Sequence, residues 1–181
     1  MPHRDDPQSP SESAAIRSVV INAVRLSDDT VHQLEQTWGV RIQDAAYWYD
    51  PRSGAWGLEG GPCAGFVPAG LSLGGPLRPD ASRGNTGVFV NGRELHALDV
   101  MALQRLGPVF PGRYWVDAHG NFGFEGGPMM GNLMVAAQIA GGAGSGRGTG
   151  GAWTADSRFG TVGGDGSGFV FFNVGKTFYS N

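Results

Sequence analysis

The sequence predicts an α+β fold built from two tandem β-α-β-β repeats related by pseudo-twofold symmetry, with aromatic β-hairpins packed on two short helices. A duplication in the chain is the main support, because residues 47–62 read YWYDPRSGAWGLEGGP and residues 114–128 read YWVDAHGNFGFEGGP. The similarity extends upstream, where residues 20–36 align with residues 89–105 at an offset of 69. In both copies a stretch with helical spacing is followed by a β-prone aromatic run. We therefore expect a duplicated domain over residues 16–140, with repeat one at 18–65, a connector at 66–87 and repeat two at 88–131.

A short helix is expected in each repeat after an opening β-prone run. In repeat one, Ser27 is a suitable N-cap and Gly39 ends the helix, with apolar residues on one face between them. In repeat two, His96 takes the N-cap position and Gly107-Pro108 marks the end.

An aromatic hairpin is expected to close each repeat. In the first, Asp50-Pro51 suits the start of a type I turn, and Gly54 supplies a residue with positive φ. Asp117 and Gly120 repeat this turn chemistry one residue shorter. The two hairpins are therefore expected to form the aromatic part of the core.

The segments outside the repeats have simpler patterns. Residues 1–15 are polar and are predicted to be disordered, whereas the Gly/Pro-rich connector at 66–87 is predicted to be an ordered surface loop. The apolar run 132–140 fits either a short buried helix capped by Asn132 or a strand. Residues 141–181 are predicted to form a glycine-rich tether and a C-terminal β-strand.

The composition of the 181-residue chain argues against several classes of protein. Its 32 glycines lack a three-residue period, which excludes collagen. No apolar run reaches the roughly 20 residues of a membrane span. The first 15 residues hold no apolar signal-peptide core, so we expect a cytoplasmic location, although export without a signal peptide stays open. A net charge of −3 without a basic cluster argues against nucleic acid, and one cysteine without zinc spacing predicts no metal and no cofactor.

Four carboxylates recur at matching places in the two repeats. They are Asp50 with Asp117, and Glu59 with Glu125. Two carboxylates at the repeat interface can work as general acid and base in a small hydrolase or lyase, with His119 as a proton carrier. Hydrogen bonding within the turns explains the aspartates without catalysis, and we favour that interpretation.

Aromatic side chains on the two hairpins give the clearest indication of function. Side chains alternate along a strand, so one face of each hairpin lines the core and the other can present rings to a protein or a glycan. We favour the structural interpretation for these rings, a two-sided core with the helices on one face and the connector over the other, because so glycine-rich a domain needs its large side chains for stability. The residues concerned are Tyr47, Trp48, Tyr49, Trp56, Tyr114, Trp115 and Phe122.

The sequence therefore favours a non-catalytic binding or assembly protein. Its partner would be another protein or a second copy of itself, and the tethered C-terminal strand would pair with a sheet edge of that partner. The alternatives are the acid/base enzyme and a glycan-binding module that uses Trp48 and Trp115. Cys63 is expected to be an inert packing residue, because Met129 takes its place in repeat two. The apolar residues of the tail strand are Phe169, Phe171, Phe172, Phe178 and Tyr179.

Overall fold

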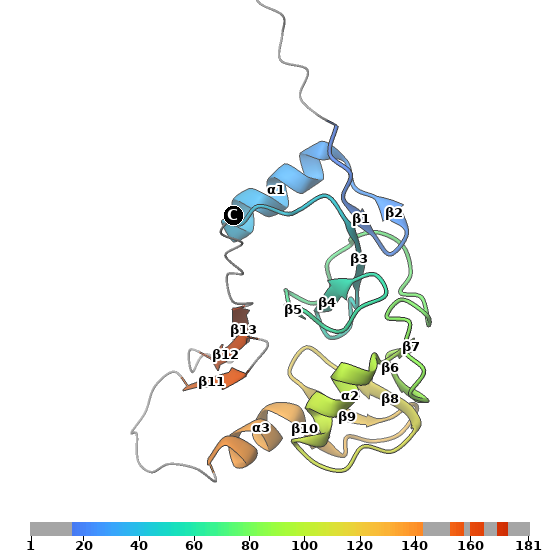
Figure 1. The fold of residues 1–181 in the computed structure, drawn as a ribbon, viewed down its shortest axis with the longest axis vertical. Helices are drawn as coiled ribbons and strands as arrows, with labels where there is room; N and C mark the ends of the chain where they lie inside the picture. Colours follow the sequence, from blue (N-terminus) through green and yellow to red (C-terminus); the bar gives the residue numbers. More distant parts are fainter. Residues whose placement is uncertain (1–15, 143–152, 158–159, 165–169, 174–181) are drawn as a thin grey trace, which may run out of the picture.

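The fold is α+β, as the sequence predicts, and is seen here in a computed structural model that describes residues 16–142, 153–157, 160–164 and 170–173. Within these residues the chain forms two five-stranded sheets, three helices and a separate three-stranded sheet. The predicted disordered segment 1–15 lies outside the described residues. Figure 1 shows the two five-stranded sheets one above the other along the length of the molecule.

The first sheet has the strand order β2-β1-β3-β4-β5, in which the β1–β3 pair is parallel and the other pairs are antiparallel. Helix α1 (Asp28–Trp38) lies between β2 and β3 in the chain. The strands are β1 (Val20–Ile21), β2 (Val24–Arg25), β3 (Ala46–Tyr49), β4 (Ala55–Leu58) and β5 (Gly65–Phe66).

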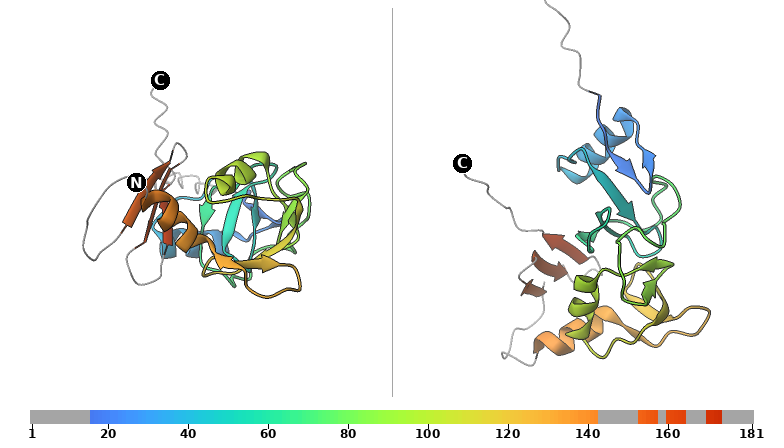
Figure 2. Two further views of the ribbon diagram at one scale, coloured as in Figure 1. Left: turned by 90° about the horizontal axis from the view of Figure 1, so that it is seen from below. Right: turned by 45° about the vertical axis from the view of Figure 1, so that its right-hand side comes forward.

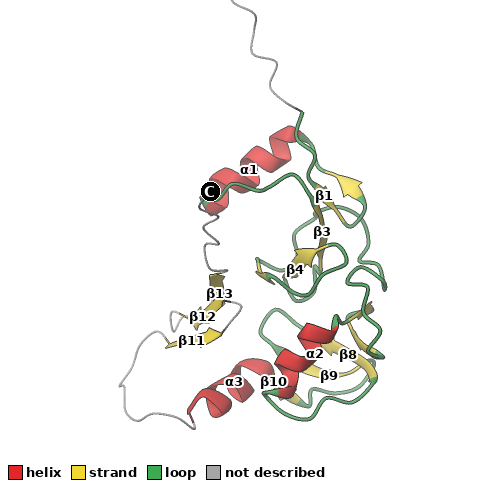
Figure 3. Ribbon diagram, viewed as in Figure 1, coloured by secondary structure: helices red, strands yellow, loops and turns green. Residues whose placement is uncertain are grey.

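The second sheet has the order β7-β6-β8-β9-β10, with β6–β8 as its parallel pair. Helix α2 (Ala97–Gln104) lies between β7 and β8 in the chain, and α3 (Leu133–Gly142) follows β10. Figure 3 shows α1 with the first sheet and α2 and α3 with the second. The strands are β6 (Val88–Val90), β7 (Arg93–Glu94), β8 (Gly112–Val116), β9 (Asn121–Phe124) and β10 (Gly131–Asn132).

Each half therefore contains more strands than the predicted β-α-β-β unit. A two-residue strand, β2 or β7, precedes the helix, and another short strand, β5 or β10, follows the hairpin. The extra strand before the helix forms because Asn22-Ala23 and Asn91-Gly92 turn the chain back on itself with positive φ at both positions. Positive φ at two successive residues is the backbone of a type I′ hairpin turn.

The start of α1 and α2 and the end of α1 follow the sequence closely, whereas α2 ends at Gln104, ahead of the expected Gly107-Pro108. The side chain of Ser27 accepts a hydrogen bond from the backbone of Thr30, and Gly39 ends α1 in the left-handed region at φ 63°. The His96 ring caps α2 by accepting from the backbone N–H of Leu98. The run after Asn132 forms a helix, not a strand, and the Asn132 side chain caps it. The outer side chains of α3 are exposed, so the expectation that this helix is buried was wrong.

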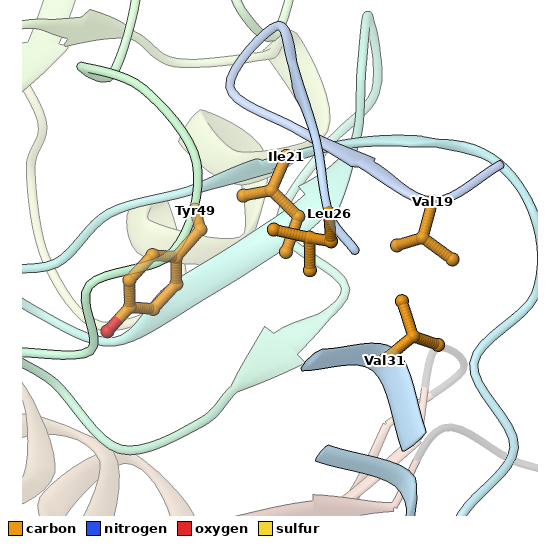
Figure 4. Close-up of a cluster of buried hydrophobic side chains, with 5 residues drawn as sticks. All are labelled: Val19, Ile21, Leu26, Val31 and Tyr49. Carbon is orange, nitrogen blue, oxygen red and sulfur yellow. The ribbon is translucent and has the colours of Figure 1, made fainter. Parts of the chain in front are cut away.

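The core of the first sheet lies on both of its faces. One cluster gathers Val19, Ile21, Leu26, Val31 and Tyr49, drawn in Figure 4, and the half-buried Tyr47 and Trp56 pack against it. The second cluster contains Trp48, Ala55 and Ala81. The connector contributes to both, because Val67, Leu71 and Leu73 pack on the first cluster, and Leu77 and Ala81 belong to the second. This arrangement matches the two-sided core that the sequence analysis favoured, except that the connector packs on both faces rather than on one.

The C-terminal part contains three strands where one was expected. They are β11 (Trp153–Ser157), β12 (Gly160–Gly164) and β13 (Val170–Asn173), joined in the order β11-β12-β13. The predicted tail strand is β13, which holds Phe171 and Phe172 and pairs with β12 of the same chain. Figure 2 shows this sheet outside the two larger ones, with β13 the strand that lies beside β5. Phe169, Phe178 and Tyr179 lie outside the described residues.

Candidate functional site

Two of the seven aromatic residues proposed as a binding surface are buried. Trp48 is 1% exposed and Tyr49 is 2% exposed, so neither ring can meet a ligand. The guanidinium of Arg93 covers the ring of Trp48 at 3.7 Å from its centre. The Tyr49 hydroxyl donates to the carbonyl of Pro68 at 2.7 Å in the connector. The prediction was wrong for these two residues because elements distant in the sequence cover both faces of the hairpin.

The other five predicted aromatic residues are half-buried. The rings of Tyr47 and Trp56 pack edge to face with centres 6.0 Å apart. Tyr114 stacks instead on Phe124, a neighbour on β9 that the sequence analysis did not select. The remaining two are Trp115 and Phe122.

Asp50 is buried and serves the turn between β3 and β4. Its carboxylate accepts hydrogen bonds from the Ser53 hydroxyl at 2.5 Å and from the backbone N–H of Arg52 at 2.9 Å. A third hydrogen bond comes from the side-chain amide of Asn91 at 2.6 Å, across from the second sheet. Asp50 therefore joins the two sheets as well as closing its own turn.

Asp117 plays the turn role in the second sheet. Its carboxylate accepts from the backbone of His119 at 2.8 Å and from the backbone and side chain of Asn121 at 3.0 and 2.9 Å. Burial acts to raise the pKa of Asp117, but these hydrogen bonds outweigh it and hold the pKa below its usual value. His119 itself is exposed.

The paired glutamates each hold an arginine of the same sheet or its connector. Glu59 lies 2.9 Å from Arg78, and Glu125 pairs with Arg113. In the part of the chain that the structure describes, no group of three His, Cys, Asp or Glu side chains could hold a metal ion. All four predicted carboxylates thus have local partners that account for their positions.

Two asparagines that the sequence analysis did not select hold the parallel strand pairs. Asn22 lies just after β1 at φ 47°, and Asn91 lies just after β6 at φ 51°. The Asn22 side chain accepts from the N–H of Tyr49 and donates to the carbonyl of the same residue. Asn91 makes the same two hydrogen bonds with Val116. The Asn91-Gly92 pair is a strong hairpin signal that could have shown this turn from the sequence.

Arg93 is the second residue that the sequence analysis missed. It is buried between the two sheets, where it covers Trp48, bonds the hydroxyl of Ser82 and lies 3.3 Å from the carboxylate of Asp99. Asp99, in the first turn of α2, also accepts from the backbone N–H of Cys63 at 2.8 Å. No local sequence signal marks Arg93, because its partners come from three separate segments.

Cys63 lies in this contact between Asp99 and the first sheet, and its thiol is unreactive. Its thiol donates to the carbonyl of Gly65 at 3.3 Å. Burial, together with the nearby Asp99 carboxylate, raises the pKa of the Cys63 thiol to about 12, so almost no thiolate exists at neutral pH. The contacts agree with its expected role as a packing residue.

An open hollow of about 500 Å³ lies beside the start of α1. Arg17 lines this hollow. Its guanidinium forms ion pairs with Asp44 at 2.7 Å and Glu35 at 3.1 Å, which balance its charge. The backbone N–H of Ile42 lowers the pKa of Glu35, and Arg17 lowers the pKa of Asp44. This network ties the segment before β1 to the end of α1 and the loop after it.

The outer surfaces of the two helices differ in polarity at matching positions. In α1, Asp29 and His32 face solvent, as expected for a surface helix. The residues 69 positions later, Leu98 and Met101 of α2, are 41% and 57% exposed. Helix α2 has no buried residue at all. An apolar outer face on a short surface helix is typical of a contact region.

Within the described residues, none of the helices combines the length and the apolar character needed to cross a bilayer.

Two curated proteins of Arabidopsis thaliana resemble the chain. It is 40% identical to "Extra-large guanine nucleotide-binding protein 1" over 88 residues, which are 48% of this chain and 10% of that protein. It is 29% identical to "Extra-large guanine nucleotide-binding protein 2" over 114 residues, 61% of this chain and 13% of that protein. No family profile matches the chain, and no solved structure matches it. The chain is thus similar to a segment that makes up about a tenth of the length of these curated relatives.

Proposed function

We propose that the chain is a non-catalytic protein-binding module and that the outer face of α2 is its main contact surface. The observation that carries this proposal is the difference between the helices, polar at Asp29 and His32 but apolar at Leu98 and Met101. Both helices follow a two-residue hairpin and precede a parallel strand, so local structure does not explain the difference. Covering the α2 face with a partner would remove its apolar surface from water.

The two five-stranded sheets are proposed to be copies of one ancestral unit. Their strand orders agree, and their parallel pairs each carry one asparagine in the same left-handed turn. In each copy a tryptophan lies opposite a glycine, Trp48 with Gly57 and Trp115 with Gly123. On this proposal one copy kept a polar outer helix face while the other acquired an apolar one.

The contacts of the candidate residues support binding over the two alternatives. Asp50 and Asp117 hold turns, and Glu59 and Glu125 hold arginines, which are structural uses. The glycan alternative needed Trp48 as an open platform, but that ring lies under Arg93.

The relatives support the idea of a module that occurs in different protein contexts. Both are named as guanine nucleotide-binding proteins, and the chain matches only about a tenth of each. We infer that the matched segment serves such proteins through a protein contact, with its partner to be found on the face formed by Leu98 and Met101.

Site-specific photo-crosslinking tests the proposal. A benzophenone amino acid would replace Met101 in the full chain, and a matched control would carry it at His32 on α1. We expect a defined protein adduct in cells from position 101 and none from position 32. Adding Leu98→Asp, which gives α2 the polar residue of α1, should reduce the adduct at least fivefold. Equal adducts from positions 101 and 32 would contradict the proposal.

A further inference from the structure

The side-chain amide of Asn91 lies at the contact between the two five-stranded sheets. Its nitrogen donates to the Asp50 carboxylate of the first sheet at 2.6 Å and to the carbonyl of Val116 at 2.8 Å. Its oxygen accepts from the N–H of Val116 at 3.0 Å. We call these three hydrogen bonds the amide clamp. The clamp joins the sheets through a group that has to remain an uncharged hydrogen-bond donor, because its partner across the contact is a carboxylate.

The residue after Asn91 makes this amide chemically different from the other asparagine amides of the chain. Asn91-Gly92 is the single Asn-Gly pair in the sequence. Glycine has no Cβ, so its backbone nitrogen is the least hindered nucleophile for the side-chain carbonyl carbon of the asparagine before it. A Cβ placed at Gly92 would meet nothing within 4 Å, so the surrounding chain does not crowd this position. Within the described residues, the N–H of Gly92 donates to no acceptor.

We propose that Asn91 is a self-modification site at which the chain deamidates. The backbone nitrogen of Gly92 bonds to the side-chain carbonyl carbon of Asn91 and gives up its proton, and the amide nitrogen of Asn91 leaves as ammonia. The product is a cyclic imide. Water then breaks one of the two imide C–N bonds, adding hydroxide to the carbon and a proton to the nitrogen. The result is aspartate or isoaspartate, nothing is oxidised or reduced, and water is the co-reactant.

The amide clamp controls how often this reaction starts. Attack makes the planar amide carbon tetrahedral and expels its nitrogen, so the three hydrogen bonds of the clamp have to break first. The bond to the Asp50 carboxylate is the strongest of the three, because its acceptor is charged. Asn22 is held in the same way by Tyr49, but the next residue is Ala23, whose methyl group hinders the backbone nitrogen. Asn22 is therefore an internal control for Asn91.

Deamidation would turn the contact between the sheets from an attraction into a repulsion. The new carboxylate would lie where the Asn91 amide nitrogen now lies 2.6 Å from the Asp50 carboxylate, and like charges this close repel strongly. Asp50 is 3% exposed, so water screens the pair little. Isoaspartate also lengthens the main chain just before Arg93, which covers Trp48. The modification is irreversible, so the contact would not form again.

The first experiment compares Asn91 with Asn22 in the full-length protein. The protein is incubated at neutral pH and digested with trypsin, which puts the two asparagines in separate peptides that end at Arg25 and Arg93. Mass spectrometry should show conversion at Asn91 at least tenfold faster than at Asn22, with isoaspartate among the products. Unfolding in guanidinium chloride should accelerate conversion at Asn91 further. Equal rates at the two asparagines in the folded protein, or a product without isoaspartate, would overturn the proposal.

Asp50→Asn tests the clamp. It replaces a charged acceptor with a neutral amide, and the new side chain cannot cyclise, because Pro51 has no N–H. Conversion at Asn91 should rise about tenfold, with the rate at Asn22 unchanged. Asp117→Asn makes the same change in the turn of the second sheet and is the matched control, with conversion at Asn91 as in wild type. An equal rise in both variants, or no rise in Asp50→Asn, would overturn the role of the clamp.

Asn91→Asp tests the consequence, because it installs the product carboxylate directly. Its urea midpoint should lie below that of wild type. Adding Asp50→Asn should recover most of the loss, since the neutral amide at position 50 can donate to the new carboxylate. A wild-type midpoint for Asn91→Asp, or no recovery in the double variant, would overturn the repulsion. None of these measurements involves the outer face of α2, so their failure leaves the Met101 crosslinking test unaffected.

Discussion

Asn22 and Asn91 make the same pair of hydrogen bonds in the two sheets. Each side-chain amide donates to a carbonyl at 2.8 Å, and each side-chain oxygen accepts from the N–H of that same residue at 3.0 Å. The side chain thus continues the parallel ladder by one step after the backbone has turned away. Their third contacts differ, since Asn22 donates to the carbonyl of Gly75 and Asn91 to the carboxylate of Asp50.

Replacing Asn91 should destabilise the protein through two separable effects. Asn91→Gly removes the hydrogen bonds but tolerates φ 51°, and it should lower the free energy of unfolding by about 2 kcal/mol. Asn91→Ala loses the same hydrogen bonds and should lower the free energy of unfolding by roughly 1 kcal/mol more, because alanine is disfavoured in the left-handed region. Urea denaturation measures both. Gln36→Ala, on the exposed side of α1, should change stability little, and equal effects of the glycine and alanine variants would contradict the prediction.

Arg93 should contribute strongly to stability because it is a buried cation between the two sheets. Arg93→Ala leaves the carboxylate of Asp99 without this partner and exposes the Trp48 ring, so we expect a loss of about 3 kcal/mol. Arg93→Lys keeps the charge but loses the planar stack and should recover only part of the loss. Denaturant unfolding tests this, with the exposed Arg105→Ala as control. A loss below 1 kcal/mol for Arg93→Ala would show that the stack is dispensable.

The two glycines opposite the hairpin tryptophans should not tolerate a side chain. A Cβ at Gly57 would lie 2.3 Å from the carbonyl oxygen of Pro62, and one at Gly123 would lie 2.2 Å from that of Pro128. Either Gly→Ala substitution should cost about 2 kcal/mol or more, because backbone must move to make room. Thermal unfolding gives the comparison. Gly107→Ala, with nothing within 4 Å, should be close to neutral, and a neutral Gly57→Ala would refute the packing argument.

The free energy of unfolding should decrease as the pH is lowered below about 4. The pKa values of Glu35, Asp44 and Asp117 are lower in the folded chain than their usual values of 4.5, 3.8 and 3.8. A carboxyl group with a lowered folded-state pKa stabilises the fold above its unfolded pKa, and this contribution is lost as the pH falls through the folded value. Urea midpoints measured from pH 7 to pH 3 should show the decline. Asp117→Asn should make it shallower, and an unchanged slope in that variant would count against the assignment.

Local signals in the sequence predicted the helix caps well, although α2 ends a few residues before Gly107-Pro108. Ser27, Gly39, His96 and Asn132 act through atoms within a few residues of themselves, so that their roles follow from chemistry along the chain. The turn aspartates were predicted for the same reason: the Asp117 carboxylate bonds the backbone two residues later. The α+β class follows from these local elements.

The burial of the hairpin rings could not be predicted in this way. Strand alternation placed Trp48 on the opposite face from Tyr49, and the structure confirms this. Whether either face stays exposed depends on Arg93 and the connector, which lie 18 or more residues beyond Tyr49 in the chain. The outer face of α2 was missed because the sequence analysis looked for rings rather than for an apolar helix surface.

The connector has a consequence for dissecting the protein. Residues 67–87 form neither helix nor strand, yet they cross from one layer of the first sheet to the other and seal both. A truncation made at the apparent boundary after β5 would leave Tyr49 and Trp48 in contact with water, and the fragment would be expected to precipitate. The smallest piece worth expressing from the N-terminal half therefore runs on through this stretch and takes in Arg93.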